Sequence, residues 1–219
     1  MHIPWIDIHA HTFRQERGVL SVYNVIYGNE KKLSPISFSI GVHPWYIPGK
    51  IDWKRLEDIV ARPECLAVGE TGMDRIRSNE SIEWQEAVFL AQVEMANRYA
   101  KPVIIHCVRC FDRLAALRKY GHTPWIIHGF DKKDTLMRQL IAQGFRLSFG
   151  KALLTNDNQA FVRSVERVDL DKIFFETDDS DRDIRDIYAA FARMRDISPE
   201  NLRERVFDNF RRVFKNSVI

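Results

Sequence analysis

The sequence predicts an α/β protein of the TIM-type (β/α) barrel class, and three observations carry that prediction. Short runs of apolar, β-branched and aromatic residues recur along the 219 residues. Amphipathic helical patterns separate most of these runs. Several runs are almost continuously apolar, which is typical of parallel strands covered on both faces. A barrel of this kind can exceed 200 residues without splitting, so we expect a single domain over residues 1–219.

Eight apolar runs are expected to form strands, because their residues fit a pleated and buried surface. In chain order they are Ile3–His9, Val19–Ile26, Ile36–Val42, Leu66–Glu70, Val103–His106, Trp125–His128, Phe145–Phe149 and Ile173–Glu176. Their regular alternation with helical segments favours a barrel over an open antiparallel sheet.

The segments between these runs carry helical periodicity. Asp52–Ala61 places Trp53, Leu56, Ile59 and Val60 on one stripe. Ser198 followed by Pro199 provides an N-cap and a proline at the first helical position, which predicts a helix that begins there and continues through Phe214. The other expected helices are Ile82–Tyr99, Phe111–Lys119, Lys133–Ala142 and Asn158–Glu166.

One segment interrupts the alternation. Only Tyr27–Pro35 separates the second and third expected strands, and it contains Gly28 and Pro35. Both residue types interrupt regular structure, so the segment has no room for a full helix. The sequence therefore predicts a shortened barrel that lacks one covering helix.

Composition narrows the function classes. Lysine and arginine exceed aspartate and glutamate by three, a bias that permits an anionic substrate but does not indicate a dedicated nucleic-acid-binding surface. No apolar stretch approaches the roughly 20 residues of a membrane span, and no secretory signal is visible, so we expect no membrane partner. Three cysteines argue against a disulfide framework and favour a cytoplasmic location.

Ionisable residues gather at the carboxyl ends of the expected strands. In parallel barrels these ends build the active site, so residues far apart in sequence should meet there. His9 and His11 also share a strand face, because successive side chains alternate. The residues concerned are His9, His11, His43, His106, His128, Glu70 and Asp178. Their placement predicts a metal-centred site.

Mixed imidazole and carboxylate ligands suit divalent zinc, manganese, nickel or iron, and carboxylates also bind magnesium. The two oxygens of Glu70 could bridge two cations. Paired metals about 4 Å apart polarise a phosphoryl group and lower the pKa of bound water. The residues therefore indicate a two-metal hydrolase.

A series of short motifs, in order over almost the whole chain, resembles the TatD-type metal-dependent deoxyribonucleases, which are amidohydrolase-like barrel enzymes. The motifs are Asp7-Ile8-His9-Ala10-His11, Gly41-Val42-His43-Pro44, Gly69-Glu70-Thr71-Gly72-Met73-Asp74, Pro102-Val103-Ile104-Ile105-His106, His128-Gly129-Phe130, Ser148-Phe149-Gly150, Glu176-Thr177-Asp178 and Asn209-Phe210-Arg211-Arg212-Val213-Phe214.

The resemblance implies a role for each matching position. His9 and His11 would bind a first metal, and Glu70 would bridge to a second. His106 and His128 would bind the second metal. Asp178 would ligate the first metal and orient or deprotonate the attacking water, so that Asp178 and Glu70 are the expected catalytic residues.

The same resemblance implies the substrate and cofactors. Members of the family are phosphodiesterases that remove nucleotides from DNA ends with divalent cations. We therefore expect an exonuclease-type DNase that uses a water activated by two metal ions, which could be magnesium, manganese or zinc. His43, Arg109 and Asp74 are expected to face the substrate, either a DNA end or a small phosphodiester.

The chain departs from the family pattern after Asp178, where an acidic loop runs to Asp183. Extra carboxylates repel a polyanion unless cations neutralise them. One alternative is a hydrolase of a small phosphate ester, lactone or amide on the same barrel. Glu70 stands where many amidohydrolase barrels use a modified lysine, which favours the phosphoesterase. A second alternative is a metal-binding scaffold without turnover, which would bind metal but hydrolyse nothing.

Overall fold

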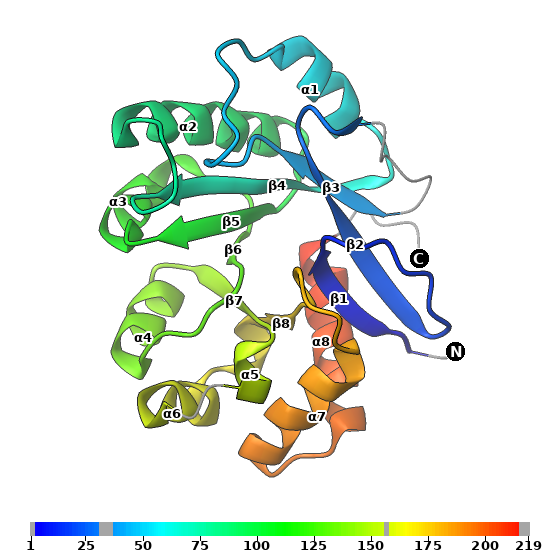
Figure 1. Cartoon of the computed structure of the whole chain (residues 1–219). Helices are drawn as coiled ribbons and strands as arrows, with labels where there is room; N and C mark the ends of the chain where they lie inside the picture. The colour runs from blue at the N-terminus through cyan, green and yellow to red at the C-terminus, as the bar shows by residue number, and fades with distance from the viewer. Residues whose placement is uncertain (1–2, 31–36, 156–157, 215–219) are drawn as a thin grey trace. The chain divides into compact units, whose positions relative to one another are not determined.

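The computed structural model describes residues 3–30, 37–155 and 158–214 (Figure 1). Residue contacts divide this part of the chain into two compact units. One unit contains residues 3–23 and 128–214, and the other contains residues 24–30 and 37–127. The single domain expected from the sequence stays a prediction.

Eight strands form where the apolar runs predict them, and their order in the sheet repeats their order in the chain. They are β1 (Trp5–Ala10), β2 (Val19–Ile26), β3 (Phe38–Gly41), β4 (Cys65–Asp74), β5 (Val103–Val108), β6 (Trp125–Ile127), β7 (Phe145–Phe149) and β8 (Ile173–Phe175). Strand β4 continues four residues past Glu70, where Thr71 and Gly72 interrupt the apolar run and hide the true end from the sequence.

All the helices expected from the sequence form, within two residues at each end. They are α1 (Trp53–Val60), α2 (Ile82–Arg98), α3 (Phe111–Leu117, continued as a 3-10 turn over Arg118–Tyr120), α4 (Asp134–Ala142), α6 (Gln159–Arg167) and α8 (Pro199–Val213). Helices α5 (Ala152–Thr155) and α7 (Ile184–Arg195) and the 3-10 turn Leu170–Lys172 are additional. The expected lack of a helix between the second and third strands falls largely on residues 31–36, outside the described residues.

In the unit of residues 24–127, β3, β4, β5 and β6 are parallel neighbours. Helix α1 packs on β3 and β4, α2 packs on β4, and α3 packs on β5 (Figure 1). Phe89 of α2 meets Trp125 of β6 edge to face, with ring centroids 5.1 Å apart, within the range typical of such pairs. These contacts bury the strands and leave their carboxyl ends to carry polar side chains.

In the unit of residues 3–23 and 128–214, β7 pairs with β8, and β1 lies beside β8. Helices α7 and α8 pack on both β1 and β8 (Figure 1). The hydroxyl of Tyr188 on α7 donates to the carbonyl of Ile6, 3.0 Å away, and its ring lies 4.3 Å from that of Phe175. The two strands that carry His9 and precede Asp178 are therefore fixed side by side.

Asn209 of α8 connects that helix to β8. Its side chain is fully buried, and Nδ2 donates to the carbonyls of Leu170 at 2.7 Å and Ile173 at 3.1 Å. Because Asn209→Ala would leave the Leu170 carbonyl and the buried Ile173 carbonyl without this donor, we expect it to lower the free energy of unfolding by about 1–3 kcal/mol. Urea denaturation checks this, with the exposed Asn201→Ala on the same helix as the control. Equal stability of the two variants would contradict this role.

No helix among the residues that the structure describes is both long and apolar enough to cross a membrane.

Candidate metal centre

One group of ligand-type side chains, here named the His9 cluster, comprises His9, His11 and Asp178. Asp178 Oδ1 lies 3.3 Å from His11 Nε2 and 3.7 Å from His9 Nε2. Backbone hydrogen bonds fix this approach, because the Asp178 amide donates to the His9 carbonyl and the His11 amide donates to the Asp178 carbonyl, both at 2.9 Å. Two imidazoles and one carboxylate thus converge from the ends of β1 and β8.

His128 lies beside this cluster in the same unit. Its ring centroid is 4.7 Å from that of His9. Its Nδ1 lies 3.3 Å from Oε1 of the fully buried Glu176, which also accepts a hydrogen bond from the Gly129 amide at 2.7 Å. A carboxylate on one ring nitrogen fixes the orientation of a histidine and leaves the other nitrogen for a ligand. The sequence analysis did not single out Glu176, although it begins the motif that ends at Asp178.

Asp7 holds the two strands of the His9 cluster together. Burial raises the pKa of its carboxyl to about 7, and hydrogen bonds from Thr177 and His9 oppose that rise. The Thr177 hydroxyl donates to Oδ2 at 2.7 Å, and the Thr177 and His9 amides donate to Oδ1 at 3.1 and 3.3 Å. Sequence reasoning missed this role, although strand alternation places Asp7 on the same face as His9.

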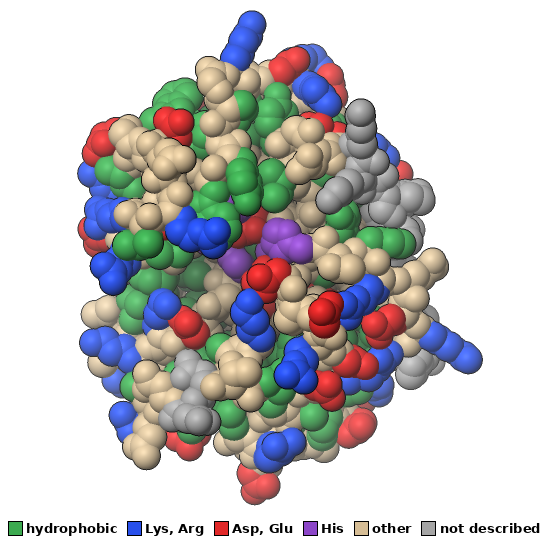
Figure 2. Space-filling view, viewed as in Figure 1, with side chains coloured by type: hydrophobic (Ala, Val, Ile, Leu, Met, Phe, Trp, Pro, Cys, Tyr) green, Lys and Arg blue, Asp and Glu red, His purple; other side chains and the backbone are tan. Residues whose placement is uncertain are grey.

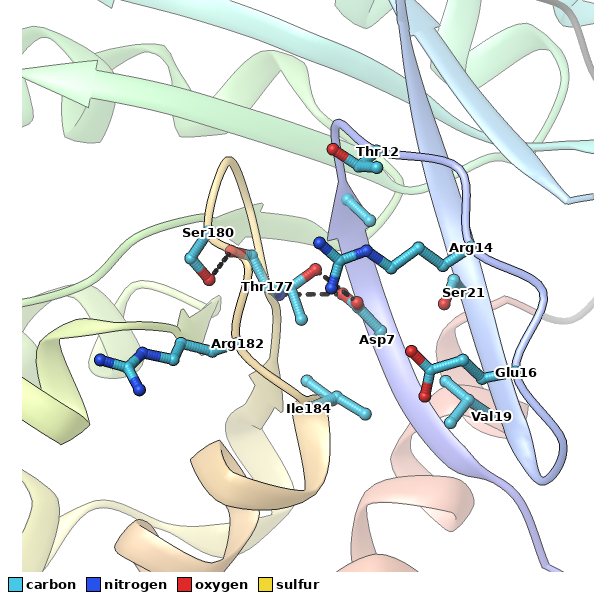
Figure 3. A pocket seen from close by; sticks show the side chains of 11 residues that line it. Asp7, Thr12, Arg14, Glu16, Val19, Ser21, Thr177, Ser180, Arg182 and Ile184 are labelled. Atoms are coloured by element: carbon cyan, nitrogen blue, oxygen red, sulfur yellow. Dashed lines mark hydrogen bonds between the residues drawn. The ribbon is translucent and has the colours of Figure 1, made fainter.

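A polar pocket adjoins this cluster (Figure 3). Figure 3 shows the hydrogen bonds that join Thr177 to Asp7, while the Arg182 side chain points away from them. Arg14 Nη2 donates to Asp181 Oδ1 at 2.8 Å. Two of the lining residues bond to a third, because Asp7 accepts from the Thr177 hydroxyl and the Ser180 hydroxyl donates to the Thr177 carbonyl.

The acidic loop after Asp178 is neutralised by neighbouring cations. Three of its aspartates form ion pairs within the unit: Asp179 with Lys151 at 2.5 Å, Asp181 with Arg14 at 2.8 Å, and Asp183 with Arg185 at 2.8 Å. Exposed pairs of this kind add little stability. They do offset the negative charge that the sequence places beside the cluster.

A second group, here named the Glu70 cluster, comprises His43, Glu70 and His106. Glu70 Oε1 lies 3.0 Å from His43 Nε2 and 2.9 Å from His106 Nδ1. All three side chains are buried. Asn24 orients the glutamate, because its Oδ1 accepts from the Glu70 amide at 2.8 Å and its Nδ2 donates to Glu70 Oε2 at 3.4 Å.

Asp74, at the end of β4, fixes the other side of His106. Its Oδ2 lies 3.0 Å from His106 Nε2 and accepts from the Trp45 indole at 2.6 Å. Burial alone would raise the pKa of Asp74, but hydrogen bonds from Trp45, His106 and two backbone amides outweigh it and lower the pKa to about 2. Asp74 is therefore an anion between two ring donors.

Gly72 explains how β4 and β5 bring Glu70 and His106 together. A Cβ atom at Gly72 would lie 2.0 Å from the backbone oxygen of His106, closer than any side chain tolerates. Its φ of +144° also disfavours other residues. The absence of a side chain thus allows the backbone that carries His106 to approach β4.

The structure therefore places His9, His11, His128 and Asp178 in one unit and His43, Glu70, His106 and Asp74 in the other. The pairing of His106 with His128 on one metal, expected from the sequence, stays a prediction. His43 contacts Glu70, and its expected contact with substrate also stays a prediction. Arg109 is exposed just past β5, and its carbonyl accepts from Arg75 at 3.1 Å.

The donor sets fit a divalent metal. In each cluster one atom from each side chain lies within 4.8 Å of the others, and each set mixes imidazole nitrogens with a carboxylate oxygen. Such sets suit zinc, manganese and related cations. On the face drawn in Figure 2, basic and acidic side chains of the described residues are interspersed, in keeping with the small net charge.

Histidine and carboxylate clusters at the ends of parallel strands are typical of metal-dependent hydrolases. The family model of TatD-related DNases matches residues 23–215, and the chain belongs to this family. The structure of YjjV, a TatD homolog from Escherichia coli K12, is similar with a TM-score of 0.83 and 20% identity, over 98% of this chain and 99% of that one. This likeness confirms the predicted fold class, a TIM-type α/β barrel.

Two relatives illustrate the range of the family. The uncharacterized metal-dependent hydrolase YcfH of Escherichia coli K12 is 29% identical over 82% of this chain and 74% of its own length. The 3'-5' ssDNA/RNA exonuclease TatD of Erwinia billingiae is 31% identical over 63% of this chain and 55% of its own length. The protein is therefore a metal-dependent hydrolase of the TatD family, and its substrate is a separate question.

Proposed function

We propose that the protein is a phosphodiesterase that removes nucleotides from the ends of single-stranded nucleic acid with two divalent metal ions. The observation that carries this is the presence of two separate imidazole–carboxylate donor sets, the His9 cluster and the Glu70 cluster. Two cations are what an in-line phosphoryl displacement uses to stabilise both the attacking and the leaving oxygen. The TatD exonuclease of Erwinia billingiae, a relative by sequence, supports nucleic acid as the substrate.

In this proposal His9, His11 and Asp178 hold one metal, and Glu70 and His106 of the Glu70 cluster hold the other. The metals, which could be magnesium, manganese or zinc, supply charge to polarise the phosphoryl group and to acidify water. In this proposal the Asp178 carboxylate, whose Oδ1 lies 3.3 Å from His11 Nε2, accepts the proton of the attacking water.

The charge of the chain is compatible with this substrate. Lys151, Arg14 and Arg185 neutralise the acidic loop that follows Asp178. Arg109, which is exposed and directly follows β5, adds a positive charge three residues after His106. A polyanion can therefore approach without meeting an unpaired acidic loop.

The test compares three substrates with purified protein and magnesium, manganese or zinc. Single-stranded DNA with a free 3' end should be shortened stepwise, and a small phosphodiester should be hydrolysed more slowly. A panel of lactones should not react. His11→Ala, prepared in parallel, controls for contaminating nucleases. Hydrolysis of lactones alone would show that the phosphodiesterase assignment is wrong, and metal binding without any hydrolysis would indicate a scaffold.

A further inference from the structure

Exposed aromatic surface lies directly beside the Glu70 cluster. Trp45 and Tyr46 follow His43 and Pro44 in the segment after β3. The Tyr46 side chain is 55% exposed, and its ring centroid lies 5.6 Å from that of the buried His43. An exposed tyrosine ring beside a buried ligand set offers an aromatic surface on which a planar group can stack.

Trp45 gives this surface a rigid support. Its indole Nε1 donates to Asp74 at 2.6 Å, and its ring centroid lies 4.7 Å from that of His43 and 5.2 Å from that of His106. The Tyr46 amide donates to the His43 carbonyl at 2.9 Å. The position of the Tyr46 backbone is thus set by the same residues that set the cluster.

A cation is stacked on the same support. The guanidinium of Arg77 lies 3.6 Å from the ring centroid of Trp45, and Arg77 is exposed. Within the described residues no ion pair is recorded for Arg77. Ile76 next to it is 58% exposed and adds apolar area. The surface therefore combines an aromatic face, an apolar edge and a positive charge.

These features match one nucleotide more closely than a small phosphate ester. Aromatic side chains bind single strands by stacking on bases, and arginine adds contacts to the same strand. On the basis of the proposed function, we propose that Tyr46 is the platform on which the terminal nucleobase of a single strand stacks while its phosphate reaches the Glu70 cluster, with Arg77 contacting the strand. Tyr46 is thus a specificity-determining residue for base-bearing substrates.

The test uses two oligonucleotides, one with an ordinary 3'-terminal nucleotide and one whose terminal nucleotide is abasic. Tyr46→Ala is expected to raise KM for the ordinary oligonucleotide about 5- to 100-fold with little change in kcat, because a stacked base is lost. It should leave KM for the abasic oligonucleotide unchanged. Tyr46→Phe keeps the ring and should behave like the wild type.

Tyr120→Ala is the matched control. Tyr120 is 49% exposed in the same unit, but it precedes β6 and so lies at the amino end of a strand. The KM values of the Tyr120→Ala variant for both oligonucleotides should equal those of the wild type. A rise in KM for both oligonucleotides with Tyr46→Ala, or for neither, would overturn the platform.

Binding separates this inference from the proposed function. In the His11→Ala background, fluorescence anisotropy should show the same selective weakening by Tyr46→Ala for the base-bearing strand. If the wild type cleaves neither oligonucleotide, the proposed function fails. If the wild type cleaves both and Tyr46→Ala binds the two oligonucleotides as the wild type does, only the platform fails.

Discussion

Asp178→Asn is expected to reduce turnover about 100-fold or more while preserving the fold. The substitution removes the carboxylate that lies 3.3 Å from His11 Nε2 and that would accept the proton from water. The fold should persist because asparagine tolerates the left-handed backbone found at this position, where φ is +54°. Steady-state kinetics on single-stranded DNA and circular dichroism measure the two effects.

Asp179→Asn is the matched control, one residue along the same acidic loop. Asp179 pairs with Lys151, and its side chain is 65% exposed, so its loss should change kcat by no more than about twofold. If Asp179→Asn were the more damaging substitution, the proton-accepting role would belong to Asp179.

Glu70→Gln should weaken metal loading and activity together. The substitution keeps the size of the side chain but removes the charge from a carboxylate whose Oε1 lies about equally far from His43 and His106. Loss of groups that only orient a ligand already lowers metal affinity about 10- to 100-fold, and loss of a ligand charge should cost at least as much. Metal content after dialysis and calorimetric titration measure the change.

Glu64→Gln serves as the control for this variant, because Glu64 lies just before β4 and its side chain is partly exposed beside Arg62. Metal content and activity should match those of the wild type. Glu70→Gln with full metal content and full activity would remove Glu70 from the site.

The strands could be predicted because burial on both faces requires nearly unbroken apolar runs, and the runs survive in the sequence at Phe145–Phe149 and elsewhere. Helix α7 (Ile184–Arg195) was not expected from the sequence. Its N-cap, Asp183, is one carboxylate among several in the acidic loop, and only the structure shows which one accepts from the Arg185 amide. The composition of the loop does not show which of its aspartates has the backbone position needed to cap the helix.

The candidate site divides in the same way. The candidate metal ligands could be predicted because ionisable residues have few structural reasons to gather at the carboxyl ends of strands. They are His9, His11, Glu70, His106, His128 and Asp178. Asp7, Glu176 and Trp45 could not be predicted, because their hydrogen bonds form only after folding. Their partners are Thr177, His128 and Asp74. A single carboxylate inside an apolar run, or a tryptophan after a proline, has many structural explanations in a sequence.

The close approach of β4 and β5 at Gly72 has a consequence for how variation in this family should be interpreted. Gly72 has no side chain that could bind a metal or substrate, yet any side chain there would displace the strand that carries His106. Natural or engineered variants at Gly72 should therefore resemble ligand mutants in their phenotype. The candidate metal site therefore depends on Gly72, a residue that is not itself a candidate ligand, and substitutions at this position should disturb the site.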